Sequence, residues 1–363
     1  MHKSTKRIAA CFYFLFAGAV AVHCYRNSVF DIDLLSFAGN VALSDTSDPV
    51  EAHALVYRER LTPHLRGTDA DDAQARILRK RASDAYFSTL YLPYFSVKPL
   101  YILAMEAAHR AGASVIDASR VVSAVSFFGI AIAVWLYTRS PLAMAILILP
   151  EIMLLGQVNE PDGMSIMLLL WGLWAVFLKE ANLGVLPLIA SVWVRPDNLV
   201  LCVMVLVYLW LLGKLEWAKA TALIALTLAS EIFISHFGYG WRSLYFHTFL
   251  AADAGEVPHF AGADYVHAFA RGVTNTLHSS LPVYAMLWIL CLAHVRDPGL
   301  RRILALVGLP SVAHFVIFPN YEPRYYGLFF IVTAAAAVGL IADRSTWRRT
   351  GGPGSKLGTT KSA

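Results

Sequence analysis

Long apolar runs, separated by short polar breaks, dominate the pattern of this chain between residues 8 and 342. Most of the runs approach the roughly 20 residues that an α-helix needs to cross a bilayer. The run 183–194 is short for that purpose, so it either extends into the polar motif behind it or forms a broken helix. The pattern predicts an all-α polytopic membrane protein with about ten transmembrane helices. The runs are 8–25, 119–138, 141–157, 162–178, 183–194, 197–212, 218–236, 281–295, 301–318 and 325–342.

The composition agrees with a membrane protein. Of the 363 residues, 57% are hydrophobic and 15% are charged, whereas a typical soluble domain is about half apolar and about a quarter charged. The net charge of +5 arises from Lys and Arg spread over short loops and the tail. Because no basic stripe with interleaved aromatics is present, the charge does not indicate a nucleic-acid partner. The four Cys lie within or at the ends of apolar runs without CxxC spacing, which favours buried thiols over disulfides or metal ligands.

The first apolar run follows Lys3, Lys6 and Arg7, a pattern that signal peptides share with first membrane helices. The sequence AVA at 19–21 would serve as a cleavage site. The run 8–25 is nevertheless about long enough to span a bilayer, so we expect a retained helix whose basic flank lies in the cytoplasm.

Lys and Arg in the short loops set the orientation of the other helices. With the N-terminus inside, alternation also places the polar, Gly-rich tail 343–363 in the cytoplasm, where we expect it to be disordered. The membrane domain is then 1–342. The inside loops contain Arg139, Lys179, Lys214, Lys219, Arg296, Arg301 and Arg302. The outside segments are 26–118, 159–163, 194–198, 237–280 and 319–326, of which 26–118 and 237–280 are the large outer loops.

Residues 97–115, VKPLYILAMEAAHRAGASV, resemble half a membrane helix. Glu106, His109 and Arg110 favour instead an amphipathic helix lying in the outer interface, within the large first loop. A span at this position would turn the loop with Arg301 outward, against the charge rule.

Four polar clusters interrupt the apolar pattern, and the expected topology places all of them on the outer side. Charged groups at membrane depth usually face a cavity or a partner. Ordinary loop charge at a helix end would explain any one cluster, but four clusters on one face favour a shared site. The clusters are Asp31 with Asp33, Glu160 with Asp162, Arg195 with Asp197, and Glu322 with Arg324.

The residue types in these clusters suit one kind of chemistry. A carboxylate can remove a proton from an attacking hydroxyl group. Arg and Lys bind phosphate, Arg in bidentate fashion. Together they fit a phosphate leaving group on a lipid and an alcohol acceptor.

The segment FDIDLLSFAGNVA after the first run resembles the start of the outer loop in the GT-C superfamily of multispanning glycosyltransferases, close to the protein O-mannosyltransferase and aminoarabinose-transferase branch. The family's catalytic acid is commonly followed four residues later by an aromatic. Asp33 with Phe37 has this spacing, whereas Asp31 is followed by Leu35. The resemblance therefore favours Asp33 as general base, with Asp31 as the alternative.

Two further segments extend the resemblance. FSVKPLYILAMEAAHRAG is similar to the family's Lys-Pro-Pro-Leu-Tyr stretch, although it has one Pro, and Lys98 matches the lysine that faces the lipid phosphate. LLGQVNEPDGMSIMLLLWGL has an acid before a membrane helix, as in the family's second acidic motif. Asp162 matches best and Glu160 is the alternative. A first-turn acid at a helix start would also explain Asp162.

The last two motifs have an arginine in common. WVRPDNLVL resembles Arg-Pro-acid turns of several GT-C branches, in which Arg195 would contact phosphate while Asp197 would cap the next helix. NYEPRYYGLFFI resembles the closing Pro-Arg-Tyr motif. There Arg324 would neutralise the departing phosphate, with Glu322 and Tyr325 orienting it or lining the pocket.

The resemblance implies a GT-C-like bundle in the bacterial inner membrane with its active site on the periplasmic face. The implied reaction moves a sugar, with inversion, from a polyprenyl-phosphate donor to a hydroxyl on a glycan, lipid or protein. No cofactor is certain, but a divalent cation, Mg²⁺ or Mn²⁺, would fit the acids, as in some branches. The alternatives are a transporter or flippase of a lipid-linked or anionic substrate, and a non-catalytic membrane subunit.

Overall fold

The structure is a computed structural model that describes residues 3–29, 33–58, 80–240, 262–319 and 322–349. Within these ranges the chain is helical, and its one β-type contact is an isolated bridge between Val29 and Val158. The all-α prediction is confirmed for this part of the chain. Asp31 lies outside it, as does the segment 350–363 of the predicted tail.

Several helices are long and apolar enough to cross a membrane, which makes the chain a multi-pass membrane protein. In the described ranges five helices meet this test singly: α1 (Lys3–Arg26), α9 (Val115–Thr138), α15 (Trp217–Ser235), α19 (Pro298–Ile317) and α20 (Gly327–Arg349). Two further helices, α17 (Gly262–Leu277) and α18 (Leu281–His294), meet at a bend of 73° and together form one broken span or a re-entrant segment. The helix α20 runs past residue 342, the expected end of the membrane domain.

The other expected runs form helices that are short or interrupted, so the count of ten spans is not confirmed. A helix of eight residues rises only about 12 Å, well under the roughly 30 Å of a hydrocarbon core. Pro at positions 141 and 150 stands at the start of helical pieces, which breaks the third run. The pieces are η1 (Pro141–Ala143), α10 (Met144–Leu147), α11 (Pro150–Gln157), α12 (Asp162–Leu173), η2 (Trp174–Leu178), η3 (Asn182–Gly184), α13 (Val185–Val192), η4 (Pro196–Asn198) and α14 (Leu199–Leu211).

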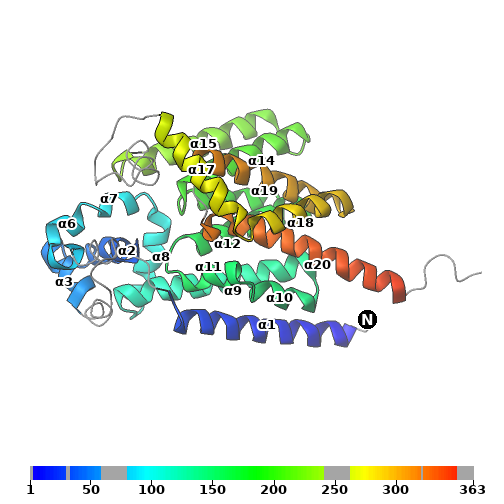
Figure 1. Ribbon diagram of the computed structural model, residues 1–363, viewed down its shortest axis with the longest axis horizontal. Helices are drawn as coiled ribbons and strands as arrows, with labels where there is room; N and C mark the ends of the chain where they lie inside the picture. The colour runs from blue at the N-terminus through cyan, green and yellow to red at the C-terminus, as the bar shows by residue number, and fades with distance from the viewer. Residues whose placement is uncertain (1–2, 30–32, 59–79, 241–261, 320–321, 350–363) are drawn as a thin grey trace, which may run out of the picture.

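The first outer loop forms a small cap of helices at one end of the bundle (Figure 1). The cap has its own apolar core, in which Phe37, Tyr101 and Met105 are fully buried. In residues 97–115 the helix α8 has only 12 residues, fewer than the roughly 20 that a single span needs, and the chain turns at Gly112 with φ +106° before α9 begins. The cap helices are α2 (Asp33–Ala42), α3 (Pro49–Arg58), α6 (Ala85–Thr89), α7 (Leu92–Phe95) and α8 (Pro99–Arg110).

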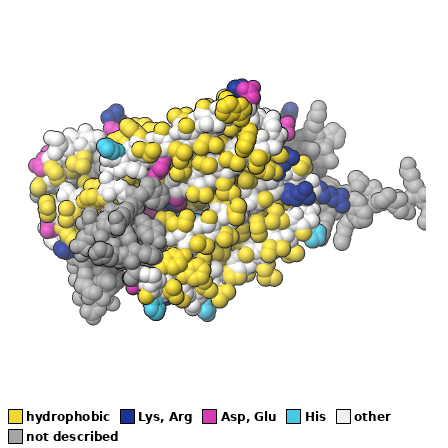
Figure 2. Space-filling view, turned by 90° about the horizontal axis from the view of Figure 1, so that it is seen from above, with side chains coloured by type: hydrophobic (Ala, Val, Ile, Leu, Met, Phe, Trp, Pro, Cys, Tyr) yellow, Lys and Arg dark blue, Asp and Glu magenta, His cyan; other side chains and the backbone are white. Residues whose placement is uncertain are grey.

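The two ends of the bundle differ as the loop alternation predicts. The start of α1 and the end of α20 lie together at the end opposite the cap (Figure 1). At that end the expected inside loops meet, because Lys214 Nζ contacts Glu180 Oε1 at 2.5 Å. Figure 2 shows a broad apolar surface between the two ends and Lys and Arg side chains gathered at the terminal end.

The helix α9 lies at the centre of the bundle and contacts α1, α8, α11, α12 and α20. It is rich in small residues and Ser, which allow neighbouring helices to approach closely. The Tyr13 hydroxyl of α1 donates to the carbonyl of Ala131 in α9 at 2.7 Å. Because α9 also contacts α8 of the cap, it fixes the cap over the ends of the other helices.

Candidate functional site

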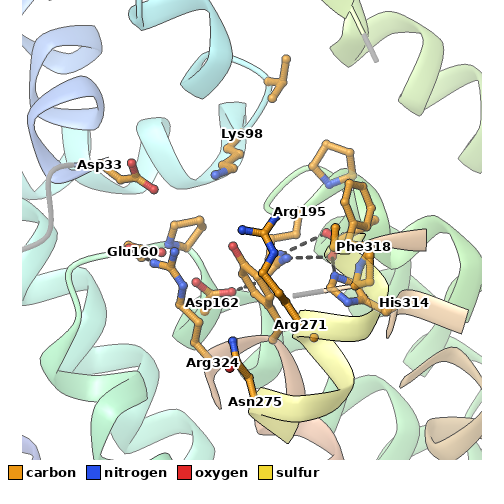
Figure 3. A pocket seen from close by; sticks show the side chains of 18 residues that line it. Asp33, Lys98, Glu160, Asp162, Arg195, Arg271, Asn275, His314, Phe318 and Arg324 are labelled. Atoms are coloured by element: carbon orange, nitrogen blue, oxygen red, sulfur yellow. Dashed lines mark hydrogen bonds and ion pairs between the residues drawn. The ribbon is translucent and has the colours of Figure 1, made fainter. Parts of the chain in front are cut away.

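The predicted outer clusters come together in a cavity of about 320 Å³. The cavity lies between the cap, the turns before α12 and α14, and the ends of α17, α19 and η5 (Pro323–Tyr326). Figure 3 shows its side chains converging from these elements. The charged residues that line it are Asp33, Lys98, Glu160, Asp162, Arg195, Asp197, Arg271 and Arg324.

Asp33 is the first residue of α2 and lines the cavity. Val29, which follows α1, is held against the end of α11, since its N–H donates to the carbonyl of Gln157 at 2.9 Å. This contact brings Asp33 to the same cavity as Glu160. Asp31 lies outside the described residues, so Asp33 remains the favoured general base and Asp31 the alternative.

Lys98 enters the cavity from the cap. It is the N-cap residue of α8, and the next turn of that helix is tied to the bundle because the N–H of Leu100 donates to the carbonyl of Trp193 at 3.1 Å. Its ammonium lies 4.9 Å from the ring centre of Phe37 and 5.2 Å from that of Phe95. The aromatic four residues after Asp33 therefore packs beneath the lysine.

Arg195 joins two carboxylates. Its Nε donates to Asp197 Oδ1 at 3.0 Å and its Nη2 to Asp197 Oδ2 at 2.8 Å, while its Nη1 pairs with Asp162. Only 15% of the Arg195 side chain is exposed. Asp197 thus binds the guanidinium instead of capping α14, whose N-cap residue is Asn198. Bidentate pairing of this kind fixes the orientation of the arginine.

Arg324 forms a second cluster of the same kind. Its Nε donates to Glu322 Oε2 at 2.6 Å, and its Nη1 pairs with Glu160, whose side chain is 5% exposed. The ring centre of Tyr325 lies 5.0 Å from the guanidinium carbon of Arg195 and 5.2 Å from that of Arg324. The two clusters therefore form one connected block, joined by a tyrosine between two arginines.

The α11–α12 turn owes its shape to a glycine. A Cβ on Gly163 would lie 2.7 Å from the carbonyl oxygen of Leu155, so a larger side chain would push the turn away from α11. Asp162 is the first residue of α12, where the helix dipole favours a negative charge. The first-turn role and the ion pair with Arg195 are thus present together.

The described site residues predicted from the sequence all lie in this one region. Glu322 is set back from the cavity wall and reaches it through Arg324. The helices α17 and α19 also contribute to the lining, which the sequence did not predict; they add Arg271, Asn275, His314 and Phe318. The sequence signal for them is weak, because Arg271 and Asn275 are four residues apart in a segment expected to belong to an outer loop.

The carboxylates do not form an obvious metal site. In the described ranges no three His, Cys, Asp or Glu side chains gather so as to hold a metal ion. Glu160, Asp162 and Asp197 each pair with an arginine. A divalent cation would have to displace these guanidinium groups, so no chemical step is assigned to one.

A second cavity, of about 180 Å³, adjoins the first. It shares Arg195, His314, Arg324 and Tyr325 with the charged cavity. It also shares Asp197. Elsewhere its walls come from α12, α14, α19 and α20 and are mostly apolar, with Ser165, Asn198 and Ser311 as the polar exceptions. The apolar lining residues include Ile166, Leu169, Leu201, Val307, Ile317 and Leu328.

Comparisons with protein-family models, with curated proteins and with solved structures found no match to this chain.

Proposed function

We propose that the protein transfers a sugar from a polyprenyl-phosphate donor to a hydroxyl group of a glycan, lipid or protein at the outer face of a membrane. The observation that supports this most is that the two cavities adjoin one another. A charged chamber lies beside a mostly apolar cavity between the helices, and Arg195 and Arg324 line both. A ligand with an anionic head and a long apolar tail fits both parts at once.

The charged chamber offers the groups that such a transfer needs. The acceptor oxygen attacks the anomeric carbon, the bond from that carbon to the phosphate oxygen breaks, and the bonding electrons leave with the lipid phosphate. Asp33 accepts the hydroxyl proton, so atoms and charge balance. Asp162 and Glu160, held by arginines, position the acceptor. The cationic side chains oppose the charge that grows on the phosphate.

The proposal extends to the architecture and its place in the cell. The helical pieces of the bundle would make up a GT-C-like fold with about ten membrane passages, some of them broken. The basic end of the bundle, with both termini, would lie in the cytoplasm of a bacterium. The chamber would then open to the periplasm, where lipid-linked sugars and acceptors meet.

The test is sugar transfer in membranes that contain the wild type, Asp33→Asn or Arg324→Ala at matched protein levels. Label is followed from a polyprenyl-phosphate donor to endogenous glycan, lipid and protein. The proposal expects transfer by the wild type and accumulation of unused donor with both variants. Wild-type rates in both variants would refute the proposed site.

A transporter or flippase is the second candidate, favoured by the 73° bend between α17 and α18, since broken helices are common in transporters. Its charged residues would be expected near the midplane. In this chain they lie at the end of the bundle beside the cap. A transporter would move the labelled lipid between leaflets without losing its sugar, so the same assay separates the two candidates.

A further inference from the structure

The cavity contains more cationic groups than its ion pairs use. The guanidinium groups of Arg195 and Arg324 face Asp162, Asp197, Glu160 and Glu322. This block of two cations and four carboxylates has an excess of negative charge when all are ionised. An anionic ligand therefore gains no net attraction from the block as a whole, because each arginine already faces two carboxylates.

Two other cations line the same cavity. Lys98 and Arg271 form no ion pair with any residue in the described part of the chain. The ammonium of Lys98 lies over the faces of Phe37 and Phe95. Figure 3 shows Lys98 entering the cavity from the cap side and Arg271 entering it from α17.

Arg271 is placed at the cavity by the packing of α17. Ala268, Arg271, Gly272 and Asn275 all line the cavity, and their spacing puts them on one face of a helix. Gly272 is buried against Pro319, whose carbonyl oxygen occupies the space that a Cβ would need. A larger residue there would lift the helix and withdraw the arginine.

A second row of contacts fixes α17 along α19. The ring of Phe269 packs edge-on to Phe315 with centres 5.5 Å apart. The Tyr265 hydroxyl donates to the carbonyl of Val316 at 2.5 Å. The direction in which Arg271 points is thus set by tertiary packing of its helix.

We propose that the donor phosphate binds between Lys98 and Arg271, while Arg195 and Arg324 are positioning residues that hold the carboxylates. This inference rests on the proposed function and assigns the phosphate within it. The phosphate has one negative charge in the donor and approaches two after the sugar leaves. Two cations that form no direct ion pair with a carboxylate stabilise the more highly charged leaving phosphate more than the donor phosphate. This difference is the condition for lowering the barrier.

The proposal is tested by lipid binding to the purified full-length protein in detergent. The ligands are decaprenyl phosphate, decaprenol and inorganic phosphate, and the dissociation constant of each is measured by microscale thermophoresis. The variants are Lys98→Ala, Arg271→Ala and Arg271→Gln. Arg110→Ala is the charge-matched control, because Arg110 is 73% exposed on α8, pairs with Glu106 and does not line the cavity.

Loss of one charge-assisted hydrogen-bond donor should weaken decaprenyl phosphate binding by about 10-fold or more. This loss is expected for Lys98→Ala and for both Arg271 variants. All three should keep wild-type affinity for decaprenol, and that affinity also shows that the variants are folded. Arg110→Ala should match the wild type. Inorganic phosphate should bind far more weakly than the lipid phosphate, since it gains nothing from the mostly apolar cavity.

Two results would contradict the proposals, and they differ. Wild-type affinity for decaprenyl phosphate in both Arg271 variants would refute the role of Arg271 and leave the proposed function standing. Equal affinity of the wild type for decaprenyl phosphate and decaprenol would mean that lipid phosphate is not recognised, and the proposed function would then fail as well.

Discussion

Removing Arg324 alone should destabilise the protein more than removing Arg324 together with Glu160. Only 13% of the Arg324 side chain and 5% of the Glu160 side chain are exposed. In the variant Arg324→Met, Glu160 would stay buried without its guanidinium partner. The substitution keeps most of the apolar stem of the side chain, so the loss reports on charge more than on packing.

The expected magnitude follows from burial. Breaking a buried ion pair from one side costs about 3 to 5 kcal/mol, because the remaining charge is left uncompensated. Glu322 loses its contact with Arg324 too, but at 35% exposure it can be hydrated, so this loss adds little. The double variant Arg324→Met with Glu160→Gln removes the orphaned charge and should recover about half of the loss or more.

The assay is unfolding of the purified protein by SDS titration in mixed micelles, with the wild type, both single variants and the double variant. The coupling energy between the two positions is obtained from the cycle of four proteins. A coupling below about 0.5 kcal/mol would refute the reasoning, because it would mean that the pair is solvated and does not hold the turn before α12.

The remaining predictions concern Lys98 in the site, His109 in the cap and Gly163 at the start of α12. Burial lowers the pKa of Lys98 to about 8, against the opposing effect of Asp33, so the charged form is disfavoured in the fold. Lys98→Met should therefore stabilise the protein at pH 7 by about 1 to 3 kcal/mol in the same SDS titration, while weakening decaprenyl phosphate binding by about 10-fold or more. Between the folded and unfolded pKa values of Lys98, the unfolded chain binds more protons than the folded protein, so the stability of the wild type should rise from about pH 8 to pH 10. An unchanged stability over that range would contradict the lowered pKa of Lys98. His109 Nε2 contacts Asp45 Oδ2 at 2.8 Å, and His109 Nδ1 contacts the Ala113 carbonyl. Burial alone would lower the pKa of His109, but these two contacts raise it, so the stabilisation that they give should be present below about pH 6.5 and be lost as the pH rises through the raised pKa. A histidine NMR titration measures this pKa, and Asp45→Asn should lower it. Gly163→Ala should lower stability by about 1 to 3 kcal/mol, because its Cβ would lie 2.7 Å from a backbone oxygen; a loss under about 0.3 kcal/mol would show that the turn can relax.

The fold class followed from the sequence because apolar periodicity and length are local properties. Each apolar run coincides with one helix or with a group of helical pieces. The breaks were harder to place. Pro150 starts α11, but the π-helical turn at Trp174–Leu178 has no composition that distinguishes it from regular helix. The number of membrane passages is therefore the part of the fold that apolar runs predict least well.

The site was predictable where charge interrupts an apolar pattern. Arg195, Arg324 and Glu160 stand out because charged groups are costly beside membrane helices. Arg271 does not stand out, since it lies in a helix that is polar on one side, where charge is ordinary. Its relation to Lys98, 173 positions earlier in the printed sequence, depends on how α17 packs on α19, which no local pattern encodes.

The pairing of the charges also required the structure. The sequence suggested that Arg195 and Arg324 would contact phosphate and that Asp197 would cap a helix. The geometry shows each arginine held by two carboxylates. Which cation meets which anion is decided by side-chain geometry across several helices, and residue type alone cannot decide it.

The most direct test of the central claim uses the purified protein in lipid vesicles with radiolabelled polyprenyl-phosphate sugars and membrane-derived acceptors. The measured quantity is the rate at which label leaves the lipid phosphate and enters an acceptor, for the wild type and for Asp33→Asn. We predict transfer by the wild type and a loss of at least about 100-fold in the variant, as expected when a general base is removed. Label that stays on the lipid with the wild type, or equal rates in the two proteins, would contradict the proposed reaction or its proposed base.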